Sequence, residues 1–242
     1  MYTFQSRVRY SEVDSSCSMD LYSILNYFQD CSNFHSEDAG VGIEYLRARH
    51  RVWLLSSWQV ELVDSPKLFD QITIGTWPYD FKGLYGYRNF VLYNDNHDHT
   101  IAAYANSIWF LMDTDTMKPM KVTDDDMAAY PVEPPYPMEY AARKIALPDA
   151  KAVQRSIFPE IPVSKTMLDS NNHVNNAQYV RLAQSCLPEG FPVRGMRAEY
   201  RKSAVLGDAI CPVQITSPDL SLCHILLNGS DGQTFAVVEF HT

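Results

Sequence analysis

The stretch from Asp169 to Tyr179 holds the densest group of short polar side chains in the sequence. It reads Asp-Ser-Asn-Asn-His-Val-Asn-Asn-Ala-Gln-Tyr. Asp169, Asn171 and His173 alternate along it, so an extended backbone would place them on one side. A carboxylate, an amide and an imidazole would then be delivered together to whatever element follows.

A helix is predicted directly after this stretch. The N-terminus of a helix carries partial positive charge and free N–H donors, which suit a polarised carbonyl or an oxyanion. The residues that indicate the helix are an asparagine cap and an apolar stripe at helical spacing: Asn175 or Asn176, then Ala177, Val180, Ala183 and Leu187.

A plainer interpretation of the same residues is an Asx-rich turn with a hydrogen-bonded histidine. Asn and Asp are common in turns because their side chains bond to nearby backbone groups. From composition alone the two interpretations stay open.

Composition sets the class of protein. The chain has 242 residues, 46% of them apolar and 12% aromatic, which is enough for one large domain or two small ones. No run approaches the ~18 apolar residues of a membrane span. The formal net charge of −9 argues against general nucleic-acid binding, which needs a basic face. It leaves room for an acidic protein partner that binds a local basic patch.

Cysteines and histidines give no sign of a metal site. The five cysteines are odd in number and form no C-x-x-C pair, so neither a zinc site nor a disulfide framework is expected. His97 and His99 lie in a polar turn without acidic or sulfur partners at ligand spacing. The first ten residues are typical of a strand, so we expect no signal or transit peptide, and the expected location is cytoplasmic.

The first half predicts a helix followed by antiparallel strands. A strand is expected over Phe4–Val13, then a turn and a long apolar helix from Leu21 that ends near Gly40 or Gly42. A helix followed by several strands with short turns is an α+β pattern. The predicted strands are Val52–Val63, Asp70–Trp77, Tyr85–Tyr93 and Ile101–Met112.

The second half repeats the first in outline. Residues Val8 to Ser15 match Val163 to Ser170 at an offset of 155, and Glu61 to Ile72 match Glu199 to Ile210 at 138. Four prolines in Pro131–Pro137 indicate a stiff linker between the two copies. We therefore predict an N-terminal domain over 1–115, a linker over 116–155 and a C-terminal domain over 156–242.

The two copies differ where chemistry is expected. Copy one keeps the acid, Asp14, but has Ser16 and Ser18 where copy two has Asn171 and His173. The second domain is therefore predicted to be catalytic, and the first, with its longer helix, is free to bind an apolar ligand.

The Asp169–Tyr179 string resembles the Asp-x-Asn-x-His-Val-Asn-Asn-x-x-Tyr signature of the acyl-ACP thioesterases. The resemblance covers nearly the whole chain and implies an α+β fold of two tandem hot-dog units, each an antiparallel sheet wrapped around a helix. Further segments that carry it are Trp53-Leu-Leu with Trp58, Ile72–Trp77, Ser107–Asp113, Lys118-Pro-Met-Lys and Glu199-Tyr-Arg-Lys.

The same resemblance implies a function. The family hydrolyses the thioester of acyl-[acyl carrier protein] and releases free fatty acid in fatty acid biosynthesis, with no metal or organic cofactor. Its partner is an acyl carrier protein with a phosphopantetheine-linked acyl chain. By motif match, Asp169, Asn171 and His173 are the catalytic residues.

One position departs from the family pattern. The family commonly has a glutamate, a candidate general base, where this chain has Ser203. Glu199 lies four residues earlier, ~13 Å along a strand, so it cannot simply substitute, and a structural role is expected for it. We assign water activation to Asp169 and His173, orientation to Asn171 and water binding to Ser203. A Ser203 nucleophile is the weaker alternative, since no G-x-S-x-G turn surrounds it.

An acyl chain needs apolar walls, and the first copy offers them. The predicted substrate-binding residues are Leu25, Phe28, Trp53 and Trp58. The predicted basic rim for the carrier protein comprises Arg143, Lys144, Arg194, Arg197, Arg201 and Lys202.

Two other functions stay open at this point, an acyl-CoA thioesterase and a non-catalytic acyl-binding protein. A homodimer is also left open, and neither the preferred chain length nor the selectivity between carrier protein and CoA follows from the sequence.

Overall fold

A computed structural model describes residues 1–148 and 153–242. Contacts divide the described chain into two compact units. The first comprises Met1–Ser56 with Val60–Ala141, and the second comprises Ser57–Gln59 with Ala142–Thr242.

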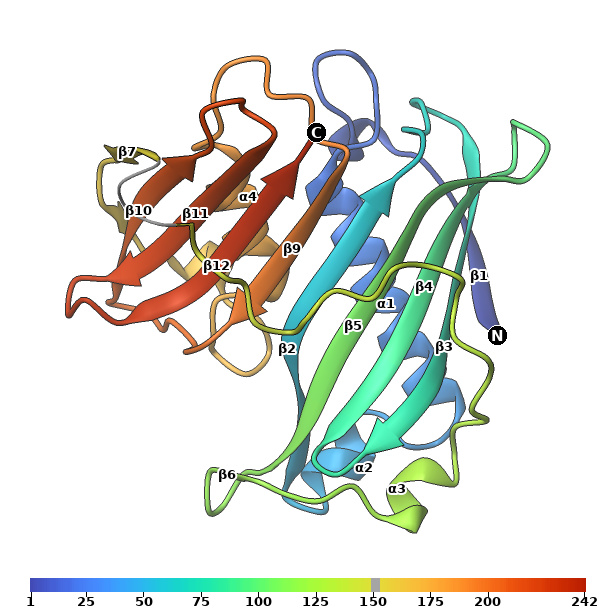
Figure 1. The fold of residues 1–242 in the computed structure, drawn as a ribbon. Helices are drawn as coiled ribbons and strands as arrows, with labels where there is room; N and C mark the ends of the chain where they lie inside the picture. The colour runs from blue at the N-terminus through green and yellow to red at the C-terminus, as the bar shows by residue number, and fades with distance from the viewer. Residues whose placement is uncertain (149–152) are drawn as a thin grey trace. The chain divides into compact units, whose positions relative to one another are not determined.

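The first unit is an antiparallel sheet with one long helix packed on it (Figure 1). Its strands lie in the order β1-β3-β4-β5-β2, and β6 pairs with β5. Its elements in chain order are β1 Tyr2–Arg7, α1 Leu21–Asp38, α2 Ile43–Arg47, β2 Arg51–Leu62, β3 Gln71–Lys82, β4 Tyr85–Asn94, β5 Thr100–Asp113, β6 Lys118–Pro119 and α3 Asp124–Met127.

Helix α1 forms where its apolar spacing predicts it. The Asp20 carboxylate accepts the Ser23 N–H at 2.7 Å, which satisfies one of the free donors of the first turn. Phe28 is fully buried, and its ring lies 5.2 Å from that of Phe90 on β4. Burying a side chain of this size contributes ~1.5–3 kcal/mol, so the helix is held mainly by this face.

The opposite face of the same sheet is covered by chain that follows α3. Asn89 neighbours Phe90 and so points the other way. Its amide oxygen accepts the Tyr136 N–H and the Tyr140 hydroxyl, each at 3.0 Å. Trp77 Nε1 donates to the Pro134 carbonyl at 2.9 Å. In Figure 1 this segment crosses β4 and β5 on the side away from α1.

The second unit is a smaller sheet with a short helix. Its strands lie in the order β9-β12-β11-β10-β7, and β8 pairs with β10. Its elements are β7 Gln154–Ile157, β8 Ile161–Pro162, α4 Asn176–Gln184, β9 Gly195–Tyr200, β10 Ala209–Thr216, β11 Leu222–Gly229 and β12 Thr234–His241.

Hydrogen bonds confirm the internal repeat at the offsets read from the sequence. Val8 N–H bonds to Asp70 O at 2.9 Å, and Val163 N–H bonds to Asp208 O at the same distance. Asp20 caps α1, and Asn175, 155 residues later, caps α4. Each unit therefore begins with the same succession of strand, turn and capped helix.

Two sequence expectations differ from the structure. The strand expected over Phe4–Val13 ends at Arg7, because the Glu12 carboxylate accepts the N–H and Nε–H of Arg9 and closes a 3₁₀ turn. Much of the stretch 116–155 expected as a linker packs on the first unit up to Ala141. Residues 149–152 of that stretch lie outside the described residues.

No helix within 1–148 or 153–242 combines the length and the apolar character that a membrane span requires.

Candidate active site

Asp169 to His173 form a closed turn and not the extended stretch expected from their alternation. Asp169 N–H donates to His173 O at 2.8 Å, and Asn172 takes the left-handed conformation with φ of 60°. The Asp169 carboxylate accepts the Asn171 N–H at 2.8 Å and the His173 N–H at 3.2 Å. The carboxylate thus bonds to the backbone of the turn that carries the imidazole.

The first unit builds the same turn without an imidazole. Asp14 accepts the N–H groups of Ser16 at 2.8 Å and Ser18 at 3.1 Å, and Cys17 has φ of 59°. The Ser18 hydroxyl, which stands where His173 stands in the second unit, receives a bond from Lys67 Nζ at 2.6 Å. The turn geometry is therefore set by the aspartate and does not depend on the side chains of Asn171 and His173.

His173 is half-buried, and within the described chain its ring makes no hydrogen bond or ion pair. Its backbone forms an isolated β-bridge with Val205. Asn171 is exposed beside it. An imidazole at the surface with both nitrogens available can exchange a proton with a bound water or substrate.

Helix α4 begins at Asn176, three residues after His173. Asn175, one of the two expected caps, accepts the Ala177 N–H at 2.9 Å, while its own N–H bonds to Met167 O. Of the first N–H groups of this helix, that of Asn176 bonds to no acceptor among the described residues. The apolar stripe is confirmed at Ala177, Val180 and Ala183, whereas Leu187 lies beyond the end of the helix at Gln184.

Ser203 lies on the segment that pairs with this turn. Ala204 O accepts the Val174 N–H at 2.9 Å, and Val205 bridges His173. Ser203, one residue before Ala204, is exposed. Ser203 and His173 therefore lie on adjacent backbone segments.

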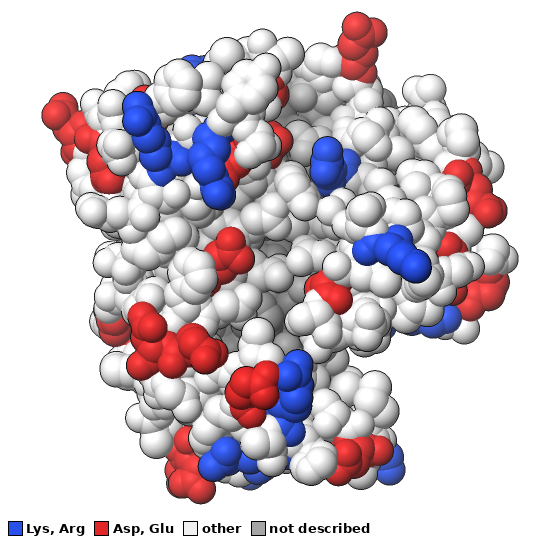
Figure 2. Space-filling view, turned by 180° about the vertical axis from the view of Figure 1, so that it is seen from behind, with Lys and Arg blue, Asp and Glu red and all other residues white. Residues whose placement is uncertain are grey.

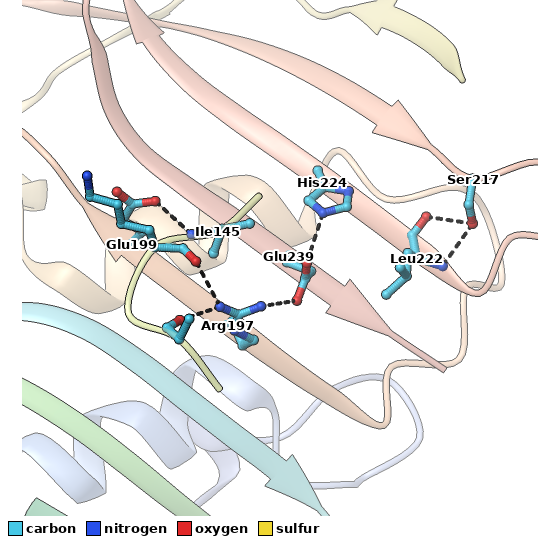
Figure 3. A network of polar contacts seen from close by, with 9 residues as sticks. Ile145, Arg197, Glu199, Ser217, Leu222, His224 and Glu239 are labelled. Atoms are coloured by element: carbon cyan, nitrogen blue, oxygen red, sulfur yellow. Dashed lines mark hydrogen bonds and ion pairs between the residues drawn. The ribbon is translucent and has the colours of Figure 1, made fainter. Parts of the chain in front are cut away.

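Glu199 lies in the sheet of the second unit and is occupied by structural contacts (Figure 3). It accepts the Ile145 N–H at 3.0 Å, and Arg201 donates to both of its oxygens at 3.1 Å. Burial would raise the pKa of this carboxyl, but the Arg201 guanidinium and the Ile145 N–H outweigh it and hold the pKa below its usual range. A paired anion of this kind supports the structural role expected for Glu199.

The predicted substrate-binding residues divide between the units. Leu25 and Phe28 are buried on α1, and Trp53 is half-buried with its ring 6.3 Å from that of Phe81. Trp58 is also buried, but Ser57–Gln59 group by their contacts with the second unit. Leu25, Phe28 and Trp53 therefore belong to the first unit, whereas Trp58 belongs by its contacts to the second.

Part of the predicted basic rim is engaged in ion pairs. Arg197 donates to Glu239 at 3.0 Å, Arg201 pairs with Glu199, and Lys202 lies 3.2 Å from Asp231. On the face in Figure 2, the described Lys and Arg side chains stand in separate groups with Asp and Glu between them. Three cations of the predicted rim are therefore partly neutralised by their carboxylate partners.

Sequence reasoning missed the role of two tyrosines that hold this site together. The Tyr179 hydroxyl accepts the Ala204 N–H at 2.8 Å, and the Tyr200 hydroxyl donates to Asn176 O at 3.0 Å. Tyr179 is the last residue of the polar string. The repeat offset of 155 aligns it with Ile24 of the first unit, and this difference between the two copies was the sequence signal that pointed to Tyr179.

Two units, each a helix that follows an aspartate-led turn and packs on an antiparallel sheet, define a tandem α+β hot-dog protein, as predicted. A family model for the acyl-ACP thioesterase N-terminal domain matches residues 1–130, which is more than half of the chain. The chain belongs to the acyl-ACP thioesterase family.

Solved structures share this fold over nearly the whole chain. An acyl-ACP thioesterase from Bacteroides thetaiotaomicron VPI-5482 is similar with a TM-score of 0.87 at 20% identity, covering 99% of this chain and 96% of its own. The 12:0-ACP thioesterase from Umbellularia californica has a TM-score of 0.83 at 18% identity, covering 100% and 97%. At these identities the likeness establishes the fold.

Curated relatives are longer than this chain. Oleoyl-acyl carrier protein thioesterase 1, chloroplastic, from Arabidopsis thaliana is 23% identical over 229 residues, which cover 88% of this chain and 63% of the relative. Across the relatives the matched part is between 50% and 67% of their length. The chain thus corresponds to about half to two thirds of these proteins.

Proposed function

We propose that this chain hydrolyses the thioester bond of acyl-[acyl carrier protein] and releases free fatty acid in fatty acid biosynthesis. One observation carries the proposal: His173 lies three residues before α4 begins at Asn176, whose N–H bonds to no acceptor in the described chain. A proton acceptor beside a backbone donor is what attack by water on a thioester carbonyl requires. Membership of the family supports the choice of substrate.

In the proposed reaction, His173 takes a proton from a water molecule as its oxygen attacks the thioester carbonyl carbon. The negative charge that develops on the carbonyl oxygen is stabilised by the Asn176 N–H and the partial positive charge of the helix N-terminus. The tetrahedral intermediate then collapses with cleavage of the C–S bond. The imidazolium returns its proton to the sulfur, which leaves a carboxylic acid and a free thiol.

The other site residues have supporting roles in this proposal. In place of the water activation assigned to Asp169 from the sequence, we propose that Asp169 holds the turn that presents His173, since its carboxylate accepts the backbone N–H groups of Asn171 and His173. The Asn171 amide orients the substrate or the water. Ser203 binds the water in place of the glutamate of the family pattern.

We further propose that the two units divide the work, with chemistry in residues 156–242 and acyl-chain binding in residues 1–115. Leu25, Phe28 and Trp53 on the first unit support this because they supply apolar surface on α1 and the sheet that it packs against. The carrier protein is the proposed partner. Cytoplasmic location and homodimer formation stay predictions.

The test is thiol release from matched panels of acyl-ACP and acyl-CoA substrates. We expect turnover of acyl-ACP, a ~10²–10⁴-fold loss in His173→Ala and little change in the matched control Ser18→Ala, which alters the corresponding residue of the first unit. Faster turnover of acyl-CoA would instead indicate an acyl-CoA thioesterase. Acyl-ACP binding without turnover would indicate an acyl-binding protein.

A further inference from the structure

Tyr179 links helix α4 to the segment that pairs with the catalytic turn. Its side chain is 2% exposed, and its hydroxyl accepts the Ala204 N–H at 2.8 Å. The ring packs edge-on against Tyr200 with 5.9 Å between centroids. Burial raises the pKa of Tyr179 to about 12, although the bond from the Ala204 N–H acts in the opposite direction, so the phenol is neutral at working pH.

The peptide of Ala204 is held from two sides. Its N–H is bonded to Tyr179 on the helix, and its carbonyl accepts the Val174 N–H at 2.9 Å. The next residue, Val205, forms the bridge with His173. The phenol therefore ties α4 to the Ser203–Val205 segment, which pairs in turn with the backbone of His173.

The first unit has a counterpart of the carbonyl bond but cannot form a counterpart of the bond to the tyrosine hydroxyl. Pro66, the counterpart of Ala204 at the offset of 138, accepts the Met19 N–H at 2.8 Å, as Ala204 accepts that of Val174. Proline has no N–H to donate. Ile24, at the offset of 155 from Tyr179, has no acceptor. Both partners of the bond are thus absent from the unit that lacks the imidazole.

We propose that Tyr179 is a positioning residue for hydrolysis, and that its bond to Ala204 holds the Ser203–Val205 segment in register with His173. The inference rests on the proposed function. A segment that carries the water site tolerates little displacement, since a misplacement of ~1 Å in a reacting geometry can cost ~10²-fold in rate. The first unit performs no such chemistry, and its fold is complete without the bond.

A merely structural tyrosine makes a different prediction. Removal of its hydroxyl would lower the stability of the second unit and leave the turnover of the folded protein unchanged. Tyr27 provides the matched control because it is also buried, and its hydroxyl bonds to Glu12 and Ser6 in the first unit.

The experiment compares Tyr179→Phe, Ala204→Pro and the double variant with Tyr27→Phe in the full chain. The first two remove the acceptor and the donor of one bond, and Ser65-Pro66 of the first unit shows that the fold accommodates proline there. We expect kcat on acyl-ACP to fall ~3–10-fold in either variant with KM nearly unchanged, which is the effect of losing one hydrogen bond. The double variant should lose no more than the larger single loss.

Hydrogen exchange gives a readout that does not depend on turnover. The amides of Ala204 and Val174 should exchange at least ~10-fold faster in Tyr179→Phe and at the wild-type rate in Tyr27→Phe.

Additive losses in the double variant, an equal loss of kcat in Tyr27→Phe, or wild-type kcat and exchange in a folded Tyr179→Phe would each overturn the inference. An inactive wild-type chain would instead overturn the proposed function, so the two failures are distinct. If Ala204→Pro fails to fold, Tyr179→Phe with both readouts still decides.

Discussion

Asp169→Asn should leave most of the hydrolysis intact, and Asp169→Ala should not. The carboxylate of Asp169 accepts two backbone N–H groups, at 2.8 and 3.2 Å, and in the described chain it makes no bond to the imidazole. An asparagine side-chain oxygen can accept the same N–H groups and is a common turn residue. Alanine offers no acceptor and leaves Asn172 in its left-handed conformation without support.

The magnitude follows from the two bonds. A hydrogen bond to a charged group contributes ~1.5–3 kcal/mol and a neutral one ~0.5–1.5 kcal/mol. Two bonds to the charged carboxylate sum to ~3–6 kcal/mol and two bonds to a neutral amide oxygen to ~1–3 kcal/mol. Asp169→Asn should therefore lower the free energy of unfolding by ~2–3 kcal/mol, and Asp169→Ala by ~3–6 kcal/mol. For a chain of this size each kcal/mol lowers the melting temperature by ~2–4 °C. Hydrolysis should fall less than ~10-fold in Asp169→Asn and considerably more in Asp169→Ala.

The assay pairs thiol release from acyl-ACP with thermal unfolding. Asp14→Asn and Asp14→Ala are the controls because Asp14 makes the same two backbone bonds in the first unit and, in addition, accepts the Ser16 hydroxyl at 2.7 Å. They should reproduce the losses of stability and leave hydrolysis near the wild-type rate. A ~10²–10⁴-fold loss in a folded Asp169→Asn would refute the turn-holding role and show that the negative charge itself takes part in the reaction.

Ser203→Glu should preserve or raise thiol release, because it restores the carboxylate of the family pattern, whereas an acyl-Ser203 adduct trapped on the wild type and detected by mass spectrometry would overturn the proposed mechanism. Leu25→Trp and Phe28→Trp should shift the released products to shorter acyl chains, by several-fold per excluded methylene at ~0.8 kcal/mol each. If both residues are plain core, melting temperatures should fall by the equivalent of ~1–3 kcal/mol with the product profile unchanged. We expect the first unit to lose stability in acid because of His35. Burial and the neighbouring Arg88 guanidinium lower the pKa of His35 to about 4 from its usual 6.5. The unfolded chain then binds the extra proton between pH 6.5 and 4, so stability is full above pH 6.5 and falls by ~1–2 kcal/mol toward pH 4 after allowance for partial exposure. Urea denaturation of wild type and His35→Gln at pH 7 and 4.5 checks this, and an equal pH dependence in both would contradict it.

Regular elements with strong local signals were predictable from the sequence. The four long strands of the first unit begin and end within a few residues of the predicted positions, apart from β3, which runs past Trp77 to Lys82. Its extension contains Pro78, which is tolerated because the register shifts between Pro78 and Asp80. Alternation of side chains cannot reveal such a bulge, since it arises from pairing with β4.

Packing of the proline-rich segment was not predictable for a similar reason. Four prolines within 131–137 indicate an extended chain, and the segment lacks regular structure. Its extended form gives it backbone groups free to bond elsewhere, and Asn89 and Trp77 of the sheet use them. Composition predicts stiffness, but only the fold decides which surface a stiff segment covers.

The candidate site shows the same division between local and distant information. Asp14 and Asp169 close turns with the same backbone bonds, so the turn is encoded by a short string that either unit contains. What separates the units are pairs of residues distant in sequence. In the first unit Ser18 pairs with Lys67, whereas in the second His173 pairs with Val205 and its imidazole bonds to no cation among the described residues. An imidazole placed at Ser18 would meet a lysine ammonium, which opposes its protonation and so weakens it as a proton acceptor for water. Transfer of the chemistry to the first unit would therefore require a change at Lys67 as well as at Ser18, and this is why a motif alone is an incomplete description of the site.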